Sequence, residues 1–345
     1  MIKERKPDFE RLVTTLRGGK ADAIPLLELG VHPKVKAALL GREIGSIRDE
    51  AEFNRLMGYD YVKIQPGIVL EVNRKKTSAA GTQPDVNMPD RAWAVEGQGV
   101  ITSWEEFHAY PFPNSDDITY GRFEEIKGAL PDGMGIIGQY GDIFTTVWEM
   151  MGFEQFAVAM YEDPPLIEAL FDKVGTLIVS MYERMAEMPH VGAFWYSDDI
   201  AYTNGLMVSP EFLRQHFFPL LGRIGAIARQ KGVPFLYHSD GYLWDVMDDI
   251  IGAGVTSLHP IEPKAMDIRD MKRRLGATLA LCGGVEVDLL ARGSKDEICG
   301  LVRGLIKDVG SQGGWCAGSS NSIPEYVPVE NYTAMVRTVL EEGSL

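Results

Sequence analysis

Two neighbouring stretches of the sequence end in polar side chains that can do chemistry. His238 and Asp240 follow the apolar run 233–237, and Glu262 follows the apolar run 255–258. Between the runs, apolar side chains recur at helical spacing and stop at glycines, which predicts a strand, a helix and a second strand. Such a crossover joins parallel strands, and parallel sheets bind ligands beyond the carboxyl ends of their strands. We therefore expect His238, Asp240 and Glu262 to face one site.

These residue types are compatible with a metal site. Side chains two residues apart in an extended segment point the same way, so His238 and Asp240 can reach one ion or substrate. Glu262 follows the next strand, and Cys316 lies in the last one. A histidine nitrogen, a thiolate and one or two carboxylates are ligands that zinc accepts, and catalytic zinc keeps one position open. The competing interpretation is a packed histidine and a core cysteine, which the spacing alone does not exclude.

Other polar side chains follow predicted strands. Asp198 and Asp199 come after the apolar run 191–196 and can supply a general base or orient a cationic substrate, although one of them can instead cap a helix or close a turn. Together with Asp240 they are the predicted catalytic residues. The residues expected to bind the substrate lie near strand ends or after the last strand: Glu28, His32, Tyr140, Tyr196 and Asn321.

The elements that must position these residues form a repeating pattern of strand and helix. This pattern predicts one (β/α)8 TIM barrel over residues 1–345, with extra N-terminal helices, the first at 8–18, and a small antiparallel excursion within 69–98. A doubly wound open sheet is the rival, but no glycine-rich dinucleotide fingerprint or phosphate loop supports it. Eight apolar runs carry the predicted strands, near Ile24, Val62, Ile136, Phe194, Leu236, Ser257, Leu279 and Trp315.

Composition excludes several classes of partner. The net charge is −15, and basic residues form only short runs such as 74–76, so we expect no nucleic acid and no anionic membrane surface as partners. No apolar run approaches the roughly 20 residues that span a bilayer. The sequence has three cysteines and begins without a basic and then apolar leader. These features predict a cytoplasmic protein.

Six segments resemble the uroporphyrinogen decarboxylase superfamily, and the resemblance covers nearly the whole chain. That superfamily has a (β/α)8 barrel and includes zinc-dependent methyltransferases that work with corrinoid proteins. The segments are GIIGQYGDIFT (135–145), YSDDIAYTNGLMVSPEFLRQHFFPLL (196–221), HSDG (238–241), HPIEP (259–263), GATLALCGGVEV (276–287) and GGWCAGSSNSIPEYVPVENY (313–332).

The resemblance is closer to the methyltransferases than to the true decarboxylases. The decarboxylases carry an arginine-rich stretch that binds substrate carboxylates, whereas residues 26–36 read LLELGVHPKVK, and their catalytic aspartate is replaced by the segment 64–67. The methyltransferases hold zinc with a His-x-Cys pair, a later Cys and in some members a Glu. On this resemblance His238, Cys316 and Glu262 are the metal ligands, and Asp240 stands in place of the first Cys.

The expected function is therefore zinc-dependent methyl transfer. The methyl group would pass between a small methylated substrate or a thiol and a corrinoid carried by a partner protein. A decarboxylase or lyase that uses Asp198, Asp199 and His238 as acid and base without a metal is the alternative, and a non-catalytic binding protein is a third class.

Overall fold

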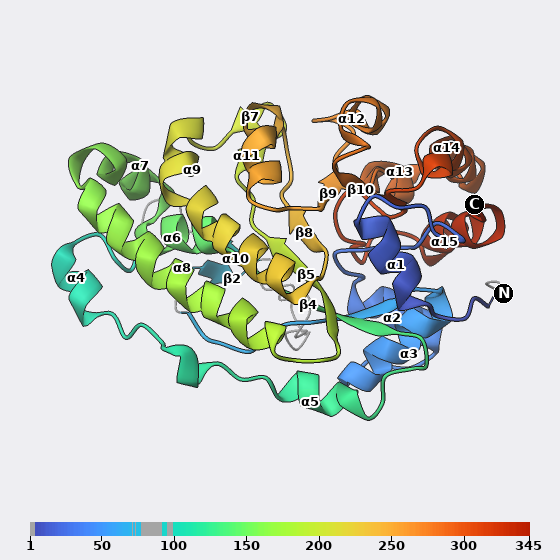
Figure 1. Ribbon diagram of the computed structural model, residues 1–345, viewed down its shortest axis with the longest axis horizontal. Coiled ribbons are helices and arrows are strands. Elements are labelled where there is room, and N and C mark those ends of the chain that lie inside the picture. The colour runs from blue at the N-terminus through green and yellow to red at the C-terminus, as the bar shows by residue number, and fades with distance from the viewer. Residues whose placement is uncertain (1–3, 71, 73, 77–91, 95–98) are drawn as a thin grey trace.

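One curled sheet of seven parallel strands forms the centre of the molecule (Figure 1). The computed structural model describes residues 4–70, 72, 74–76, 92–94 and 99–345. The strands lie in the order β1-β4-β5-β8-β9-β10-β11, so each strand pairs with the next sheet strand along the chain. Their bounds are β1 Tyr61–Ile64, β4 Gly135–Gly141, β5 Val191–Ser197, β8 Phe235–His238, β9 Ser257–Ile261, β10 Ala280–Gly283 and β11 Trp315–Cys316.

The eighth predicted strand, near Ile24, is an extended segment that makes only isolated bridges. Leu26 forms a parallel bridge to Ala317, next to β11. On the other side, the Tyr61 hydroxyl of β1 contacts both the backbone N–H and the carbonyl of Glu28, at 3.0 and 3.1 Å. The segment therefore lies between β11 and β1 and completes the ring. Pro25 cannot donate a backbone hydrogen bond, which limits the regular ladder here. The predicted barrel is confirmed, with seven regular strands and this segment in the eighth position.

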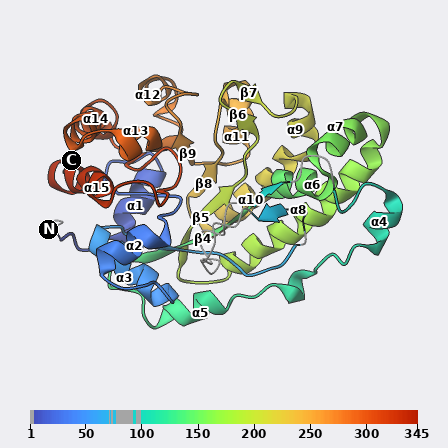
Figure 2. The same ribbon diagram turned by 180° about the vertical axis from the view of Figure 1, so that it is seen from behind.

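Helices cover the outside of the sheet, and both chain ends lie at the same end of the molecule (Figures 1 and 2). The longest helix, α8, starts where sequence predicts: the Asp163 side chain accepts a hydrogen bond from Leu166 N–H, and prolines occupy the first turn. The helices are α1 Phe9–Leu16, α2 Pro33–Leu40, α3 Ile47–Met57, α4 Trp104–Ala109, α5 Gly121–Lys127, α6 Ile143–Met151, α7 Phe153–Glu162, α8 Pro164–Ala186, α9 Pro210–His216, α10 Phe218–Lys231, α11 Met247–Gly252, α12 Ile268–Leu275, α13 Val287–Arg292, α14 Lys295–Asp308 and α15 Val329–Glu342.

Two short antiparallel pairs lie outside the main sheet. β2 (Arg74–Lys76) pairs with β3 (Ala92–Ala94), which confirms antiparallel strands within the predicted excursion at 69–98; the remainder of that prediction lies partly outside the described residues. The second pair, β6 (Ala201–Tyr202) and β7 (Gly205–Leu206), follows β5 and contributes to the barrel mouth. Among the described residues, no helix is both long enough and apolar enough to cross a membrane.

Candidate active site

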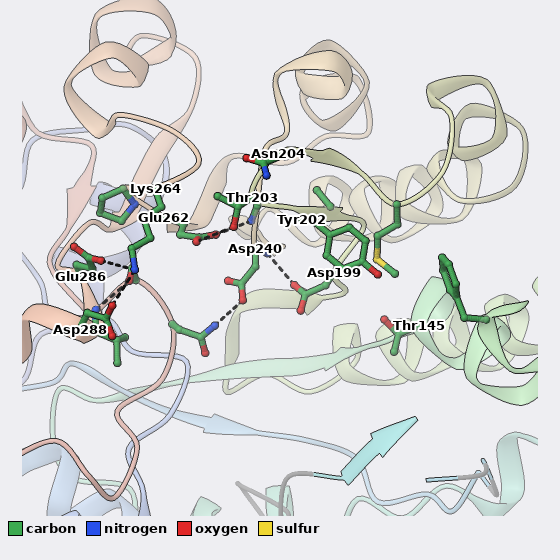
Figure 3. A pocket seen from close by; sticks show the side chains of 18 of the residues that line it. Thr145, Asp199, Tyr202, Thr203, Asn204, Asp240, Glu262, Lys264, Glu286 and Asp288 are labelled. Carbon is green, nitrogen blue, oxygen red and sulfur yellow. Dashed lines mark hydrogen bonds and ion pairs between the residues drawn. The ribbon is translucent and has the colours of Figure 1, made fainter. Parts of the chain in front are cut away.

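A cavity of about 1150 Å³ lies beyond the carboxyl ends of the strands (Figure 3). Asp199 follows β5, Asp240 follows β8, Glu262 follows β9 and Glu286 follows β10, and all four line this cavity. Parallel strands bring their carboxyl ends to one edge, which explains why residues far apart in sequence meet here. Tyr202 and Tyr326 also line the cavity and are 60% and 57% exposed, so it opens to solvent.

A smaller cavity of about 260 Å³ adjoins the first. His238 lines the smaller cavity, Asp240 lines the larger one and Asp199 lines both. Lys63 of β1 also reaches the smaller cavity. The residues at the ends of β5 and β8 therefore stand at the junction of the two cavities.

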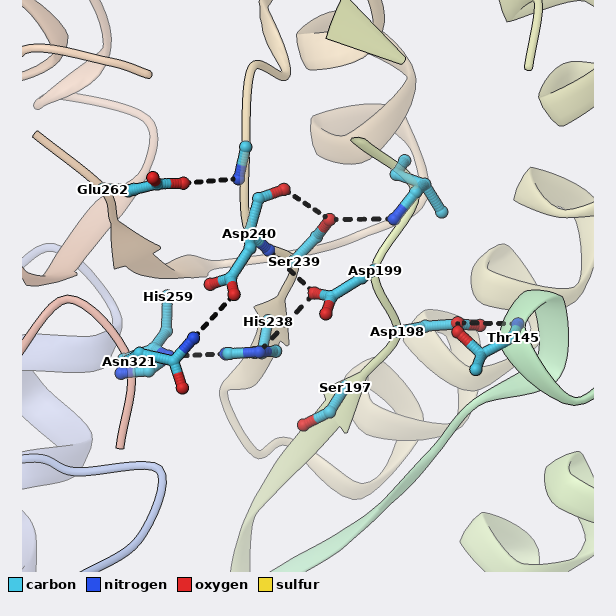
Figure 4. Close-up of polar contacts among 12 residues, drawn as sticks. Thr145, Ser197, Asp198, Asp199, His238, Ser239, Asp240, His259, Glu262 and Asn321 are labelled. Atoms are coloured by element: carbon cyan, nitrogen blue, oxygen red, sulfur yellow. Dashed lines mark hydrogen bonds and ion pairs between the residues drawn. The ribbon is translucent and has the colours of Figure 1, made fainter. Parts of the chain in front are cut away.

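Asp199, His238 and Asp240 form the group that can hold a metal ion (Figure 4). One ligand atom from each lies within 4.8 Å of the others, and no other group of three or more His, Cys, Asp or Glu does so among the described residues. Asp199 Oδ1 accepts a hydrogen bond from the backbone N–H of Asp240 at 2.8 Å and lies 3.7 Å from His238 Nε2. A strand end and a backbone hydrogen bond thus fix the three side chains relative to one another.

The carboxylate of Asp240 is only partly satisfied. Its Oδ2 accepts a 2.6 Å hydrogen bond from Asn321 Nδ2, while its buried Oδ1 has no hydrogen-bond partner. Burial, and then the nearby charges of Asp199 and Glu262, raise the pKa of Asp240 to about 8. A buried oxygen without a donor is costly unless a proton or a cation satisfies it.

The ring of His238 is held from its other side by a second histidine. His238 Nδ1 lies 2.8 Å from His259 Nδ1, and burial lowers the pKa of His238 to about 4 and that of His259 well below its usual value. Both rings are therefore neutral at pH 7, and one Nδ1 donates to the other. This contact leaves His238 Nε2 directed toward Asp199.

Asp198 has a structural position that differs from that of Asp199. Its two oxygens accept hydrogen bonds from the N–H groups of Phe144 and Thr145, the Thr145 hydroxyl and the Tyr196 hydroxyl, at 2.7–3.0 Å. Asp198 is 1% exposed, and it joins the end of β5 to the start of α6. Of the two predicted catalytic aspartates, Asp199 is therefore the one with exposed surface, with its side chain 49% exposed.

The predicted metal set of His238, Glu262 and Cys316 is not brought together. Cys316 is buried opposite Cys282 in the β10–β11 register, and burial followed by the Cys282 thiol raises the pKa of Cys316 well above its usual value. A thiol held in this state is a poor ligand. Glu262 lines the larger cavity, but its carboxylate accepts from the Gly241 N–H at 3.1 Å and stands outside the close group. The chain beyond β11 instead brings Asn321 to Asp240.

Four of the five predicted substrate-binding residues line neither of the two cavities. The carboxyl of Glu28 is buried and accepts from the Ser319 N–H and hydroxyl, at 2.9 and 2.5 Å. His32 caps α2 through a 3.3 Å contact with Lys34 N–H, and the Tyr196 hydroxyl is used by Asp198. The backbone of Tyr140 bonds to the Tyr182 hydroxyl of α8, at 2.7 and 3.0 Å. Asn321 lines the larger cavity, as expected.

Sequence inspection missed the polar wall of the smaller cavity. Gln65 Nε2 donates to Gln139 Oε1 at 2.9 Å, and Gln139 Nε2 donates to Ser197 Oγ at 3.0 Å. Together with Lys63 these side chains come from the ends of β1, β4 and β5. The available signal was a lysine inside the otherwise apolar strand 61–64, with Gln65 directly after this strand and Gln139 in the strand that pairs with it.

The residues of the close group fit a divalent ion. One imidazole nitrogen and two carboxylates are ligands of the kind that zinc and harder divalent ions accept, and such a set leaves positions open for a substrate. The buried Asp240 Oδ1, which has no other partner, supplies a ligand atom ready for a cation.

Comparison with known proteins gives the family. The family model described as uroporphyrinogen decarboxylase (URO-D) matches residues 57–342. The chain belongs to this family. A uroporphyrinogen decarboxylase of Anaeromyxobacter sp. (strain Fw109-5) is 23% identical over 231 residues, and that of Anaeromyxobacter dehalogenans (strain 2CP-C) is 25% identical over 224. Each match covers 62% of this chain and 60% of the relative, so the similarity spans less than two thirds of these uroporphyrinogen decarboxylases.

The fold is also that of a solved methyltransferase. A methyltransferase from Methanosarcina mazei superposes with a TM-score of 0.69 over 95% of this chain and 97% of its own, at 17% identity. This structural similarity extends over nearly the whole barrel of the chain. At 17% identity it establishes a shared fold only.

Proposed function

We propose that this member of the uroporphyrinogen decarboxylase family is a methyltransferase. A methyl group would pass between a small methylated compound, or a thiol, and a corrinoid carried by a partner protein. Asp199, His238 and Asp240 would hold a divalent ion such as zinc. The observation that carries the proposal is this group of close ligand atoms with an unpartnered Asp240 Oδ1, placed at the junction of two cavities.

A bound ion would act as a Lewis acid toward the heteroatom that gives up or receives the methyl group. The protein's own residues prepare that position. His259 orients His238 through the Nδ1 contact, and Asn321 holds one oxygen of Asp240, so that Nε2 and Oδ1 remain available. Asp198 fixes the start of α6 beside the site.

The shape of the site supports a reaction with a large partner cofactor. The larger cavity opens to solvent beside the exposed Tyr202 and Tyr326, where a corrinoid protein can present its cobalt. A corrinoid presented there would supply the nucleophile that takes the methyl group, and the heteroatom would keep the electron pair of the broken bond beside Asp199, His238 and Asp240. The methyltransferase from Methanosarcina mazei that shares this fold supports methyl transfer as the proposed reaction class.

Free cobalamin provides the test. Reduced cobalamin absorbance should fall and methylcobalamin should appear only when protein and methyl donor are both present, with a thiol-acceptor assay in parallel. His238→Ala and Asp240→Asn should lower the rate at least 100-fold, whereas Asp248→Asn on the exposed side of α11 should leave it unchanged. Silence in both assays over methoxyaromatics, methylamines, methyl thiols and betaines would overturn the proposal.

A metal-free lyase is the second candidate, and one observation favours it. The pKa of Asp240, raised to about 8, makes this carboxyl a proton carrier at neutral pH in the absence of an ion. Elemental analysis separates the two: about one divalent ion per chain, lost in His238→Ala, supports the methyltransferase. Full activity after exhaustive chelation supports the lyase.

A further inference from the structure

The side-chain amine of Lys63 has no carboxylate within 4 Å among the described residues. It comes from β1 and lines the smaller cavity, where its Nζ donates to the Leu29 carbonyl and lies 4.6 Å from the centre of the Trp195 ring. Burial, and then the charge of Lys36, lower the pKa of Lys63 to about 7. None of the ion pairs within 4 Å in the described part of the chain includes Lys63.

The two most buried cations of the described chain are arranged differently. Lys36 lies 2.6 Å from a Glu50 oxygen, and Arg11 lies 2.7 Å from Asp60. Buried charges are ordinarily paired in this way, since an unpaired one loses its hydration without compensation. Lys63 instead faces a cavity with room for a small molecule. An incoming anion would supply the close ion-pair partner that no described residue supplies within 4 Å.

The surroundings of Lys63 add hydrogen-bond donors for such an anion. Gln65 and Gln139 line the same cavity, and Ser197 Oγ accepts from Gln139, which leaves the Ser197 hydroxyl proton able to donate to a ligand. An ammonium beside amide and hydroxyl donors is a setting that suits a carboxylate.

The carboxylates that line this cavity are already engaged. Asp198 accepts four hydrogen bonds at the start of α6, and Asp199 belongs to the candidate ion group. Asp142, at the first position before α6, also has an interaction partner. Lys63 is the only lysine or arginine among the described residues that line the cavity.

Because Lys63 and His238 line one cavity, a single small ligand can reach both. We propose that the smaller cavity binds the carboxylate of the substrate against Lys63, Gln65 and Gln139, with the heteroatom of the same molecule at Asp199, His238 and Asp240. The substrate class is then a short-chain carboxylic acid that bears a methylthio or methoxy group. The assignment of the heteroatom rests on the proposed methyl transfer, while the carboxylate subsite rests on the cavity itself.

Matched acids and amides test the subsite, since each amide keeps the shape of its acid and removes the charge. Calorimetry on the protein as purified would compare 3-(methylthio)propanoate with 3-(methylthio)propanamide, and methoxyacetate with methoxyacetamide. At least one acid should bind tenfold or more tightly than its amide. The sulfur and oxygen pairs distinguish the two heteroatoms.

Variants then assign the preference to Lys63. Lys63→Met should reduce the acid-to-amide affinity ratio to near one, Lys63→Arg should keep part of it, and Lys295→Met on the exposed surface of α14 should keep all of it. Amides that bind the wild-type protein as tightly as acids overturn the subsite, whether or not Lys63→Met folds. Acid preference without any methyl transfer leaves the subsite and overturns the proposed function. Methyl transfer without a preference for acids over amides would support the proposed function and overturn the carboxylate subsite.

Discussion

His238 and His259 meet through their Nδ1 atoms at 2.8 Å, with stacked rings whose centres are 5.0 Å apart. Both rings are neutral, so one nitrogen must donate and the other accept. For His238 Nε2 to bind an ion, its Nδ1 must carry the proton and donate to His259. His259 is therefore a positioning residue for the candidate ion site.

This relationship predicts the effect of His259→Phe, which keeps a ring and removes the acceptor. Zinc affinity measured by calorimetry should fall about 10- to 100-fold, as is usual for the loss of an orienting partner. His108→Phe, on exposed α4, is the matched control and should leave the affinity unchanged. Unchanged affinity in His259→Phe would show that His238 does not depend on this contact.

Asp198 and Asp199 should separate stability from function. Asp198→Ala leaves the buried N–H groups of Phe144 and Thr145 without an acceptor, which should cost roughly 2–4 kcal/mol of unfolding free energy. Asp199→Ala, at an exposed side chain, should cost less than about 1 kcal/mol but abolish ion binding. Urea denaturation and zinc titration on the same two variants check this, and equal stability losses would contradict it.

Glu28 predicts a dependence of stability on pH. Burial raises its folded-state pKa to about 8, well above the value of about 4.3 in an unfolded chain. Between these values the folded protein holds the extra proton, so this contribution to stability is full at low pH and is lost as pH rises. Glu28→Gln removes the titration; its amide oxygen can still accept from the Ser319 N–H, and its amide nitrogen can donate to the Ser319 hydroxyl oxygen.

The wild-type protein should lose stability as the pH rises from 5 to 7, and Glu28→Gln should not. The unfolding free energy of Glu28→Gln minus that of wild type should therefore increase over this range, by at most about 1.4 kcal/mol per pH unit. Urea denaturation at a series of pH values measures it. Glu341→Gln, on α15 and exposed, should give a flat difference. A flat difference for Glu28→Gln as well would show that Glu28 is ionised throughout.

The protein should not decarboxylate uroporphyrinogen, although it belongs to that family. A polycarboxylate of that size must occupy the larger cavity, whose lining includes Glu149, Glu154 and Glu262. Among the described residues its one lysine, Lys264, is already paired with Glu286 and Asp288 at 2.9 Å. Like charges repel such a substrate. A true uroporphyrinogen decarboxylase in the same assay is the control, and turnover of about 1 per second or more would prove the prediction wrong.

The barrel could be predicted because its strands are buried on both faces and read as apolar runs. Seven of the eight runs are regular strands. The positions of Asp199, His238 and Asp240 at the carboxyl ends of their strands follow from that pattern. The sequence alone does not show how far along its strand each side chain lies, and therefore whether it reaches the carboxyl-end cavity. Cys316 lies within β11 beside Cys282, whereas Asn321, farther along the chain, reaches Asp240.

The smaller cavity was hidden for a related reason. Lys63 sits in an apolar run, and no local pattern distinguishes a lysine that turns toward a cavity from one that reaches solvent. The pairing of Gln65 with Gln139 joins two strands that are separated by about 70 residues of chain, and it depends on their register in the sheet. Such contacts arise only when β1 pairs with β4.

The barrel closes between β11 and β1, beside the site, through a segment that forms isolated bridges in place of a continuous ladder. Between β11 and β1, the segment 23–31 is held by isolated bridges and by a few side chains, among them Glu28 with Ser319 and Tyr61. Amide groups in such a seam exchange with solvent through local opening at a lower cost than those of a continuous ladder. The same chain segment that leaves Ser319 carries Asn321 to Asp240. Local opening between segment 23–31 and the chain after β11 would therefore free Asn321 and break its hydrogen bond to Asp240, while the strands β4, β5 and β8 stay paired.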